Sequence, residues 1–205
     1  MIRLDRAGPV WTAVIDRPDK ANSLTRAMLD ELCDIAQAAG TEARALILTG
    51  AGRVFSAGAD IDEARAGLAT DPVWERLSGA IAAAPCLTVA ALNGTLAGGA
   101  TGMVLACDIR LAVPEARFFY PVMRLGFLPQ PSDPERLARL MGRGRAAMIL
   151  LAGQRIEASE ALAWGLIDRI VPAGELADAA RALAADVCAS PPGHPAAIKR
   201  MLPPG

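Results

Sequence analysis

Short apolar runs alternate along the chain with segments of helical spacing. Residues 45–50 (ALILTG) and 87–92 (LTVAAL) are almost continuously apolar, which is typical of strands buried in a parallel sheet. Between them the spacing predicts a helix over residues 72–84, and residues 2–5 and 11–16 predict an N-terminal hairpin. Strands that alternate with helices predict an α/β fold with right-handed crossovers.

A long helix is expected after the hairpin. Thr25 can cap it, and Gly40 is expected to end it. One face is apolar and carries Met28, Leu29, Leu32, Cys33, Ile35 and Ala36.

The chain becomes mainly helical after Pro121. Asp133, followed by Pro134 and Glu135, predicts a helix that starts with Asp133 as its N-cap. Around one short strand at 167–171, four helical patterns cover residues 133–142, 144–153, 158–166 and 175–190.

Charge and cysteine content limit the partners of the protein. Lys plus Arg (21) and Asp plus Glu (22) give a net charge of -1, which disfavours nucleic acid or an anionic membrane as partner. Residues 77–107 are uncharged, but Pro85, Asn93 and five glycines interrupt them, so a buried strand and helix are expected rather than a membrane span.

The cysteines predict buried free thiols in a reducing compartment. All four (Cys33, Cys86, Cys107 and Cys188) are widely spaced, and the chain has one histidine, His194. No C-x-x-C pair is present, so no metal site is expected. The first residues show no signal or transit pattern, which predicts a cytoplasmic location.

Two glycine-containing hinges are the candidate chemistry. FSAGADI (55–61) and NGTLAGGATG (93–102) each follow a buried strand and precede a helix. Glycines let a backbone approach a ligand closely, and two amides converging on one oxygen would form an oxyanion hole. Close packing of helix on sheet is the alternative explanation for each hinge.

Five motifs, in order, resemble the crotonase (enoyl-CoA hydratase/isomerase) superfamily as far as about Lys199: RPDKANSL, LTGAGRVFSAGADI, AALNGTLAGG, ACDIRLA and RLGFLP. The resemblance implies a spiral of ββα units over residues 1–190 with a helical end, and a short C-terminal helical segment over 191–205. It also implies an acyl-CoA thioester as ligand, coenzyme A being part of the substrate with no permanently bound cofactor. Trimers or dimers of trimers are the implied assembly.

The same resemblance assigns candidate binding residues. The amides of Ala59 and Gly99 would hold the thioester oxygen. Ala57, Asp60 and Ile61 would lie near the adenine, and Ala21 near the pantetheine arm.

Three of the charged candidates have alternative explanations. Lys20 and Arg17 are local cations that could meet the CoA phosphates, or they could be solvated loop charges. Asp60 could instead cap the helix that follows it.

The family's two hydratase glutamates have no counterpart here. By the resemblance their positions are occupied by Gly102 and Val122, neither of which transfers a proton, so ordinary enoyl-CoA hydration is not expected. Tyr120 and Asp133 remain as candidate acids. A half-buried strand tyrosine and a helix cap are the alternatives for these two residues.

The resemblance also implies that relatives continue beyond Lys199, which predicts a more open pocket or an altered trimer contact. The leading hypothesis is an acyl-CoA enzyme that stabilises a thioester enolate or oxyanion, as in decarboxylation or thioester hydrolysis. A non-catalytic acyl-CoA binder, or a structural subunit of a crotonase-like assembly, is the alternative.

Overall fold

The larger of two sheets runs through the centre of the molecule. In the computed structural model, which describes residues 1–6 and 8–202, it has six strands in the order β1-β2-β3-β5-β7-β10. Only the β1–β2 hairpin is antiparallel, and its register pairs Ile2 with Ile15. The strands are β1 (Ile2–Asp5), β2 (Val10–Ile15), β3 (Ala45–Gly50), β5 (Leu87–Leu92), β7 (Ile109–Ala112) and β10 (Arg169–Ile170).

A smaller sheet lies beside one end of the first. Its order is β4-β6-β8-β9, formed by β4 (Val54–Ser56), β6 (Thr95–Ala97), β8 (Arg117–Phe119) and β9 (Ile156–Glu157). Each of β3, β5 and β7 in the large sheet is followed by a strand of the small sheet and then by a helix. This is the ββα spiral expected from the sequence.

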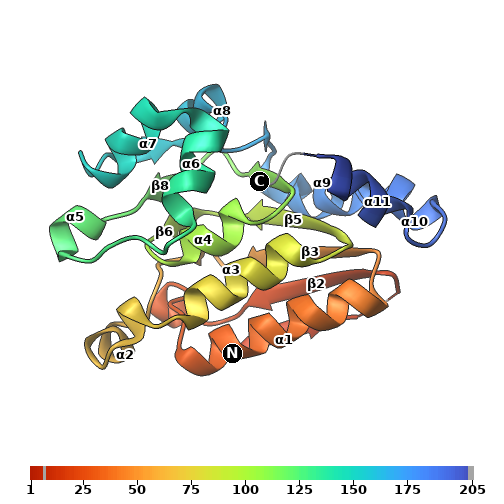
Figure 1. Ribbon diagram of the computed structural model, residues 1–205, viewed down its shortest axis with the longest axis horizontal. Helices are drawn as coiled ribbons and strands as arrows, with labels where there is room; N and C mark the ends of the chain where they lie inside the picture. Colours follow the sequence, from red (N-terminus) through yellow and green to blue (C-terminus); the bar gives the residue numbers. More distant parts are fainter. Residues whose placement is uncertain (7, 203–205) are drawn as a thin grey trace.

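Three helices cover one face of the large sheet and lie side by side in Figure 1: α1 (Arg26–Glu42), α3 (Val73–Ala83) and α4 (Ala100–Leu105). Two short helices, α2 (Ile61–Arg65) and α5 (Val122–Leu125), project at one end of the molecule. The C-terminal part adds α6 (Asp133–Met141), α7 (Arg143–Leu150), α8 (Ala158–Trp164), α9 (Leu176–Ala182), α10 (Ala185–Ala189) and α11 (His194–Met201). Single 3-10 turns cover Pro18–Lys20, Leu68–Thr70 and Ala173–Glu175.

Two predicted helix boundaries are wrong. Gly40 does not end α1, which continues to Glu42; a Cβ on Gly40 would lie 3.0 Å from Cδ of Pro85, so this glycine permits close packing instead. The single helix predicted over 175–190 is divided into α9 and α10 at Leu183 and Ala184, where Ala184 N donates to the Arg181 carbonyl in a tighter turn.

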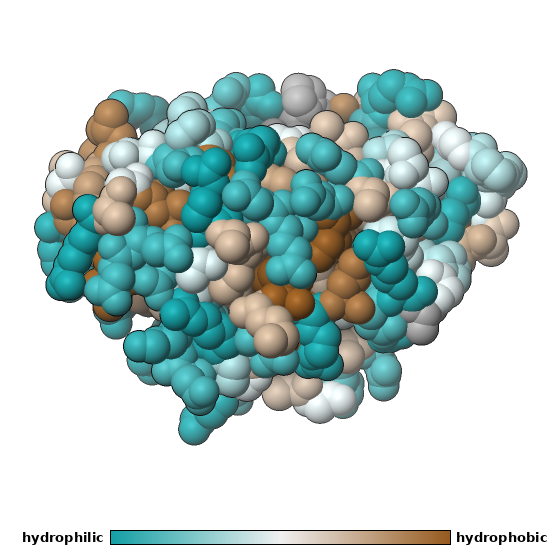
Figure 2. Space-filling view, turned by 90° about the horizontal axis from the view of Figure 1, so that it is seen from below, coloured by the Kyte–Doolittle hydropathy of each residue, from teal (hydrophilic) through white to brown (hydrophobic). Residues whose placement is uncertain are grey.

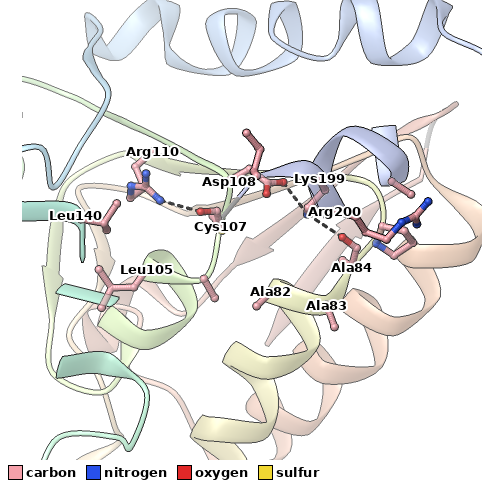
Figure 3. Close-up of a pocket in the computed structure, with 14 residues that line it drawn as sticks. Ala82, Ala83, Ala84, Leu105, Cys107, Asp108, Arg110, Leu140, Lys199 and Arg200 are labelled. Carbon is pink, nitrogen blue, oxygen red and sulfur yellow. Dashed lines mark hydrogen bonds and ion pairs between the residues drawn. The ribbon is translucent and has the colours of Figure 1, made fainter. Parts of the chain in front are cut away.

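The C-terminal helix is tied to the core by one lysine. Lys199 Nζ donates to the carbonyl oxygens of Ala84 and Cys86, at 2.8 and 3.1 Å, and pairs with Asp108 Oδ2 at 2.9 Å. Figure 3 shows this clamp beside a cavity of about 530 Å³ at the C-terminal end of α4. The segment predicted at 191–205 is therefore helical over His194–Met201, and residues 203–205 lie outside the described part.

All four cysteines are free thiols. Cys33, Cys86 and Cys107 are buried, and Cys188 is half-buried.

Apolar side chains interrupt the hydrophilic surface at the end that holds α2 and α5 (Figure 2), where Ile61 and Leu128 are 68% and 85% exposed. No helix within residues 1–6 and 8–202 has the length and apolarity to cross a bilayer.

Candidate active site

The two glycine hinges meet directly. Gly58, between β4 and α2, has φ +93°, and a Cβ there would lie 3.0 Å from the Ala97 carbonyl oxygen and 3.4 Å from Gly99 N. Gly98 has φ +59°, which a side chain rarely adopts. The absence of side chains at these positions therefore lets one hinge pack against the other.

The backbone orients one amide of the first hinge away from its own neighbours. Leu24 N donates to the Gly58 carbonyl, and Asp60 N donates to the Leu24 carbonyl, each at 2.8 Å. Because successive N–H groups of an extended segment point to opposite sides, the Ala59 N–H points away from Leu24. Among the described residues it has no hydrogen-bond acceptor.

Gly99 supplies the second amide. It is the N-cap residue of α4, and its N–H also has no acceptor within the described part of the chain. A Cβ on Gly99 would lie 3.2 Å from the ring of Trp74, so no larger residue fits without a shift. Ala59 and Gly99 are half-buried, so both N–H groups, which are unpaired among the described residues, are open to an oxygen acceptor from solvent or from a ligand.

Both amide-bearing residues line a cavity of about 500 Å³. Its walls are mostly apolar, and no carboxylate is among the described residues that form them. Val122 is one of these wall residues. The lining consists of Ala57, Ala59, Ile61, Ala64, Arg65, Ala69, Trp74, Gly98, Gly99, Tyr120, Pro121, Val122, Leu125, Phe127, Leu128 and Gln130.

The predicted CoA residues lie on the outer side of the first hinge. Ala57 N donates to the Ala21 carbonyl at 3.0 Å, which places the loop of Ala21 against the hinge. Ala57, Ile61 and Lys20 are exposed. Ala57 and Ile61 line the cavity, whereas Lys20 and Ala21 do not.

Asp60 and Arg17 are used by the protein itself. Asp60 Oδ1 caps α2 by accepting from Asp62 N and Glu63 N, and Asp60 Oδ2 pairs with Arg17 at 2.7 Å. The hydrogen bond from Arg17 lowers the pKa of Asp60. The helix-cap alternative therefore describes the observed contacts of Asp60.

Tyr120 and Asp133 form a buried pair at the inner wall of the cavity. Tyr120, directly after β8, donates its hydroxyl to Asp133 Oδ2 at 2.9 Å and accepts from Gln130 N at 3.3 Å. Tyr120 is 4% exposed and Asp133 is fully buried. The predicted N-cap role of Asp133 is wrong: Ser132 is at the cap position, and the Asp133 side chain turns to Tyr120.

Gly102 lies directly against this carboxylate. A Cβ on Gly102 would be 3.3 Å from Asp133 Oδ2 and 2.8 Å from Oδ1, and the second distance is shorter than real Cβ contacts, so the carboxylate would have to shift. Asp133 Oδ1 is inaccessible to solvent and has no hydrogen-bond partner among the described residues. The Asp133 carboxylate thus lies next to the backbone of α4, where a side chain at position 102 would begin.

Burial dominates the protonation of the pair. It raises the pKa of Asp133 to about 7, against the opposing effects of the Tyr120 hydrogen bond and of Arg136. Burial, followed by the nearby Asp133 charge, raises the pKa of Tyr120. An acid with a pKa near 7 can both accept and return a proton at neutral pH.

One residue of the site was not expected from the sequence. Trp74 has the spacing of a core residue of α3, and only the fold shows its ring against Gly99. Gln130, in the polar loop that follows the RLGFLP motif, is 8% exposed and lines the cavity. The described residues contain no cluster of His, Cys, Asp and Glu suited to a metal ion.

Comparison with known proteins gives consistent matches along the chain. The family model "Enoyl-CoA hydratase/isomerase" matches residues 6–203. The "Probable enoyl-CoA hydratase echA6" of Mycobacterium tuberculosis is 36% identical over 204 residues, covering 98% of this chain and 82% of that protein. The short-chain-enoyl-CoA hydratase of Clostridium acetobutylicum is 34% identical over 201 residues, covering 92% and 76%.

A solved structure has the same fold. The crystal structure of enoyl-CoA hydratase from Bacillus anthracis superposes with a TM-score of 0.90 at 33% identity. The match covers 97% of this chain and 81% of that one.

Proposed function

This chain belongs to the enoyl-CoA hydratase/isomerase family, the crotonase superfamily, and we propose that it binds an acyl-CoA thioester and stabilises the enolate or oxyanion formed from it. The observation that carries the proposal is the pair of amides, Ala59 N–H and Gly99 N–H, which line one cavity and have no acceptor in the described part of the chain. Donors held in place where charge develops are among the largest contributions to catalysis.

The shape of the site fits a thioester of coenzyme A. The apolar walls suit an acyl chain, while exposed Ala57, Ile61 and Lys20 lie at the outer side of the first hinge, where the nucleotide part would bind. Because Arg17 is paired with Asp60, Lys20 is the better candidate for a CoA phosphate.

Standard hydration is not part of this proposal. Adding water to a conjugated double bond requires one group to activate the water and one to protonate carbon, each contributing about 10²- to 10⁴-fold. Gly102 and Val122 provide neither group, and no carboxylate is among the described residues that line the cavity. Reactions that depend on enolate or oxyanion stabilisation, such as decarboxylation or thioester hydrolysis, make fewer demands on side chains.

Calorimetry with two coenzyme A derivatives tests the amide pair. Butyryl-CoA has the thioester carbonyl, and S-butyl-CoA is the matched thioether without it. We expect butyryl-CoA to bind about tenfold more tightly or better, because two hydrogen bonds of about 1 kcal/mol each are lost with the carbonyl. Equal affinities would contradict the assignment of Ala59 and Gly99.

Turnover separates the proposed enzyme from a binding protein. Crotonyl-CoA should not be hydrated at a rate usual for a hydratase, and a result to the contrary would refute the role given to Gly102 and Val122. Carbonyl-dependent binding with no turnover over a panel of acyl-CoA thioesters would favour a non-catalytic binder or structural subunit. No binding of any CoA thioester would refute both functions.

A further inference from the structure

Gly102 has no backbone reason to be glycine. It lies inside α4 with ordinary helical geometry, and its φ is not in the left-handed region. Glycine inside a helix costs about 1 kcal/mol relative to alanine. The compensating feature is the space it leaves, which is filled by the Asp133 carboxylate at 2.8 Å from the missing Cβ.

Burial of the Asp133 carboxylate is energetically unfavourable, because its two oxygens share a single hydrogen bond among the described residues. One oxygen accepts the Tyr120 hydroxyl, and the other is sealed against Gly102 without a donor among the described residues. An unsatisfied buried acceptor costs about 1–3 kcal/mol. An unsatisfied buried carboxylate beside a cavity is a feature found at functional sites.

Only Tyr120 of the pair reaches the cavity. Tyr120 is among the lining residues, and it follows β8, which pairs with β6 inside the second hinge. Gly98 N donates to the Phe119 carbonyl at 3.2 Å, so the residue preceding Tyr120 is bonded to the hinge that bears the Gly99 amide. A group held by that amide therefore lies close to the tyrosine.

We propose, resting on the function given above, that Tyr120 and Asp133 form a relay that moves a proton to and from the carbon next to the thioester carbonyl, and that Gly102 is required because the Asp133 carboxylate occupies its side-chain space. Tyr120 is the catalytic residue, since it faces the cavity. Asp133 acts through Tyr120 and is a positioning residue.

The relay balances in protons and charge. Tyr120 Oη takes the proton from the carbon while its own proton moves to Asp133 Oδ2. The electron pair of the broken C–H bond forms the carbon–carbon double bond of the enolate, and the carbonyl oxygen takes the negative charge between the Ala59 and Gly99 amides. Asp133 becomes neutral as the substrate becomes anionic. The reverse step protonates an enolate formed in another way, for instance by loss of carbon dioxide.

The charged and titratable groups around the relay come from three segments. Arg136 on α6 favours the ionised form of Asp133, and Glu75 on α3 disfavours it. Tyr120 after β8 supplies the hydrogen bond, and α4 contributes the uncharged Gly102. Because Asp133 must be ionised to receive the proton and burial raises its pKa to about 7, proton removal is expected to quicken as pH rises through this value.

Exchange of hydrogen for deuterium at the carbon next to the carbonyl tests the relay. Butyryl-CoA is incubated with the protein in heavy water, and its mass is followed with time. We expect exchange by the native protein, with a rate that rises to a plateau around neutral pH. Asp133→Asn and Tyr120→Phe should each lower the rate at least about a hundredfold. Both should keep the affinity for butyryl-CoA within about twofold.

A matched pair of glycine variants tests the space above α4. Gly102→Ala places a Cβ against Asp133 and should lower exchange by about tenfold or more. Gly79→Ala, in α3, puts its Cβ into open space and should leave exchange unchanged. A purely structural role of Asp133 would not move the pH profile, so an unchanged profile in Asp133→Asn overturns the relay.

The remaining outcomes are also decisive. Carbonyl-dependent binding with no exchange by the native protein overturns the relay and leaves the proposed binding of the thioester intact. Exchange by Gly102→Ala at the native rate would show that the relay does not require glycine at position 102. Absence of any CoA thioester binding overturns the relay together with the proposed function.

Discussion

Single glycines in this protein serve different physical purposes, which their surroundings distinguish. Gly58 and Gly98 adopt positive φ and bring two backbones together, while Gly99 gives room to the ring of Trp74. Gly102 has ordinary helical geometry and gives room to a carboxylate. Only the last of these affects a titratable group directly.

Burial of Asp133 makes the stability of the protein depend on pH. Its pKa is raised from 3.8 to about 7, so the folded state binds the proton more strongly than the unfolded chain does. The contribution is present below about pH 4 and is lost as pH rises through about 7, by a total of the order of 4 kcal/mol. We therefore expect the native protein to lose stability relative to Asp133→Asn between these values.

Urea unfolding of both proteins at pH 5 and pH 8 measures this difference. The variant cannot ionise at position 133, so every other titrating group cancels in the comparison. A difference in unfolding free energy that stays constant with pH would show that the Asp133 carboxylate is not held away from water as described.

The residue level was the least predictable from the sequence. Asp133 with Pro134 and Glu135 fits the local rule for a helix start, yet its side chain binds Tyr120 instead of the helix end. The partner lies 13 residues earlier, directly after β8. Nothing in the spacing shows that β8 and α6 meet, so a long-range hydrogen bond prevailed over the local preference.

At the level of elements, the site depends on two strand-to-helix hinges from adjacent ββα units. β4 and β6 are parallel neighbours in the small sheet, which brings both hinges to the same edge. Buried apolar runs followed by glycine predicted each hinge separately, and their parallel pairing placed them together. The order of strands and helices was predictable for this reason, since it follows from local patterns and right-handed crossovers.

The contact between the hinges is tested by a pair of glycine variants. Gly58→Ala introduces a Cβ 3.0 Å from the Ala97 carbonyl and 3.4 Å from Gly99 N, which should push the two amides apart. We expect its affinity for butyryl-CoA to fall by about tenfold or more, in proportion to the lost hydrogen bonds.

Gly67→Ala is the control for backbone strain. Gly67 also has positive φ, at +110°, but has open space around it. Both variants should lose about 1–3 kcal/mol of stability from backbone strain. Only Gly58→Ala should lose affinity in calorimetry, and equal affinities of the two variants would show that the hinge spacing does not control binding.

Two predictions of helix boundaries were wrong because local sequence signals did not decide where the helices end. Gly40 was expected to end a helix, but α1 continues because the glycine faces the ring of Pro85. The helix predicted over 175–190 is broken near Leu183, although its residues are good helix formers. At Gly40 the contact is made with Pro85, in a segment that the local sequence does not specify.

On the scale of the whole molecule, the spiral of ββα units places one cavity at each end of α4. The cavity at the N-terminal end is lined by Ala59, Gly99 and Tyr120, with Asp133 bonded to Tyr120, and the one at the C-terminal end is bordered by the Lys199 clamp. The sequence resemblance predicted the two hinges that line the first cavity. It did not show that the Asp133 carboxylate meets Tyr120, because that contact requires α6 to pack over α4.

Isotope-edited infrared spectroscopy of a bound thioester tests the central claim most directly. Butyryl-CoA labelled at the carbonyl carbon is mixed with the full chain, and its C=O stretch is compared with that in water and with that of the Gly58→Ala complex. Two amide donors polarise the carbonyl, so we expect the bound band at a lower frequency than in water, and a smaller shift in the variant. A bound band at or above the frequency in water would contradict the assignment of Ala59 and Gly99 as the groups that hold the thioester oxygen.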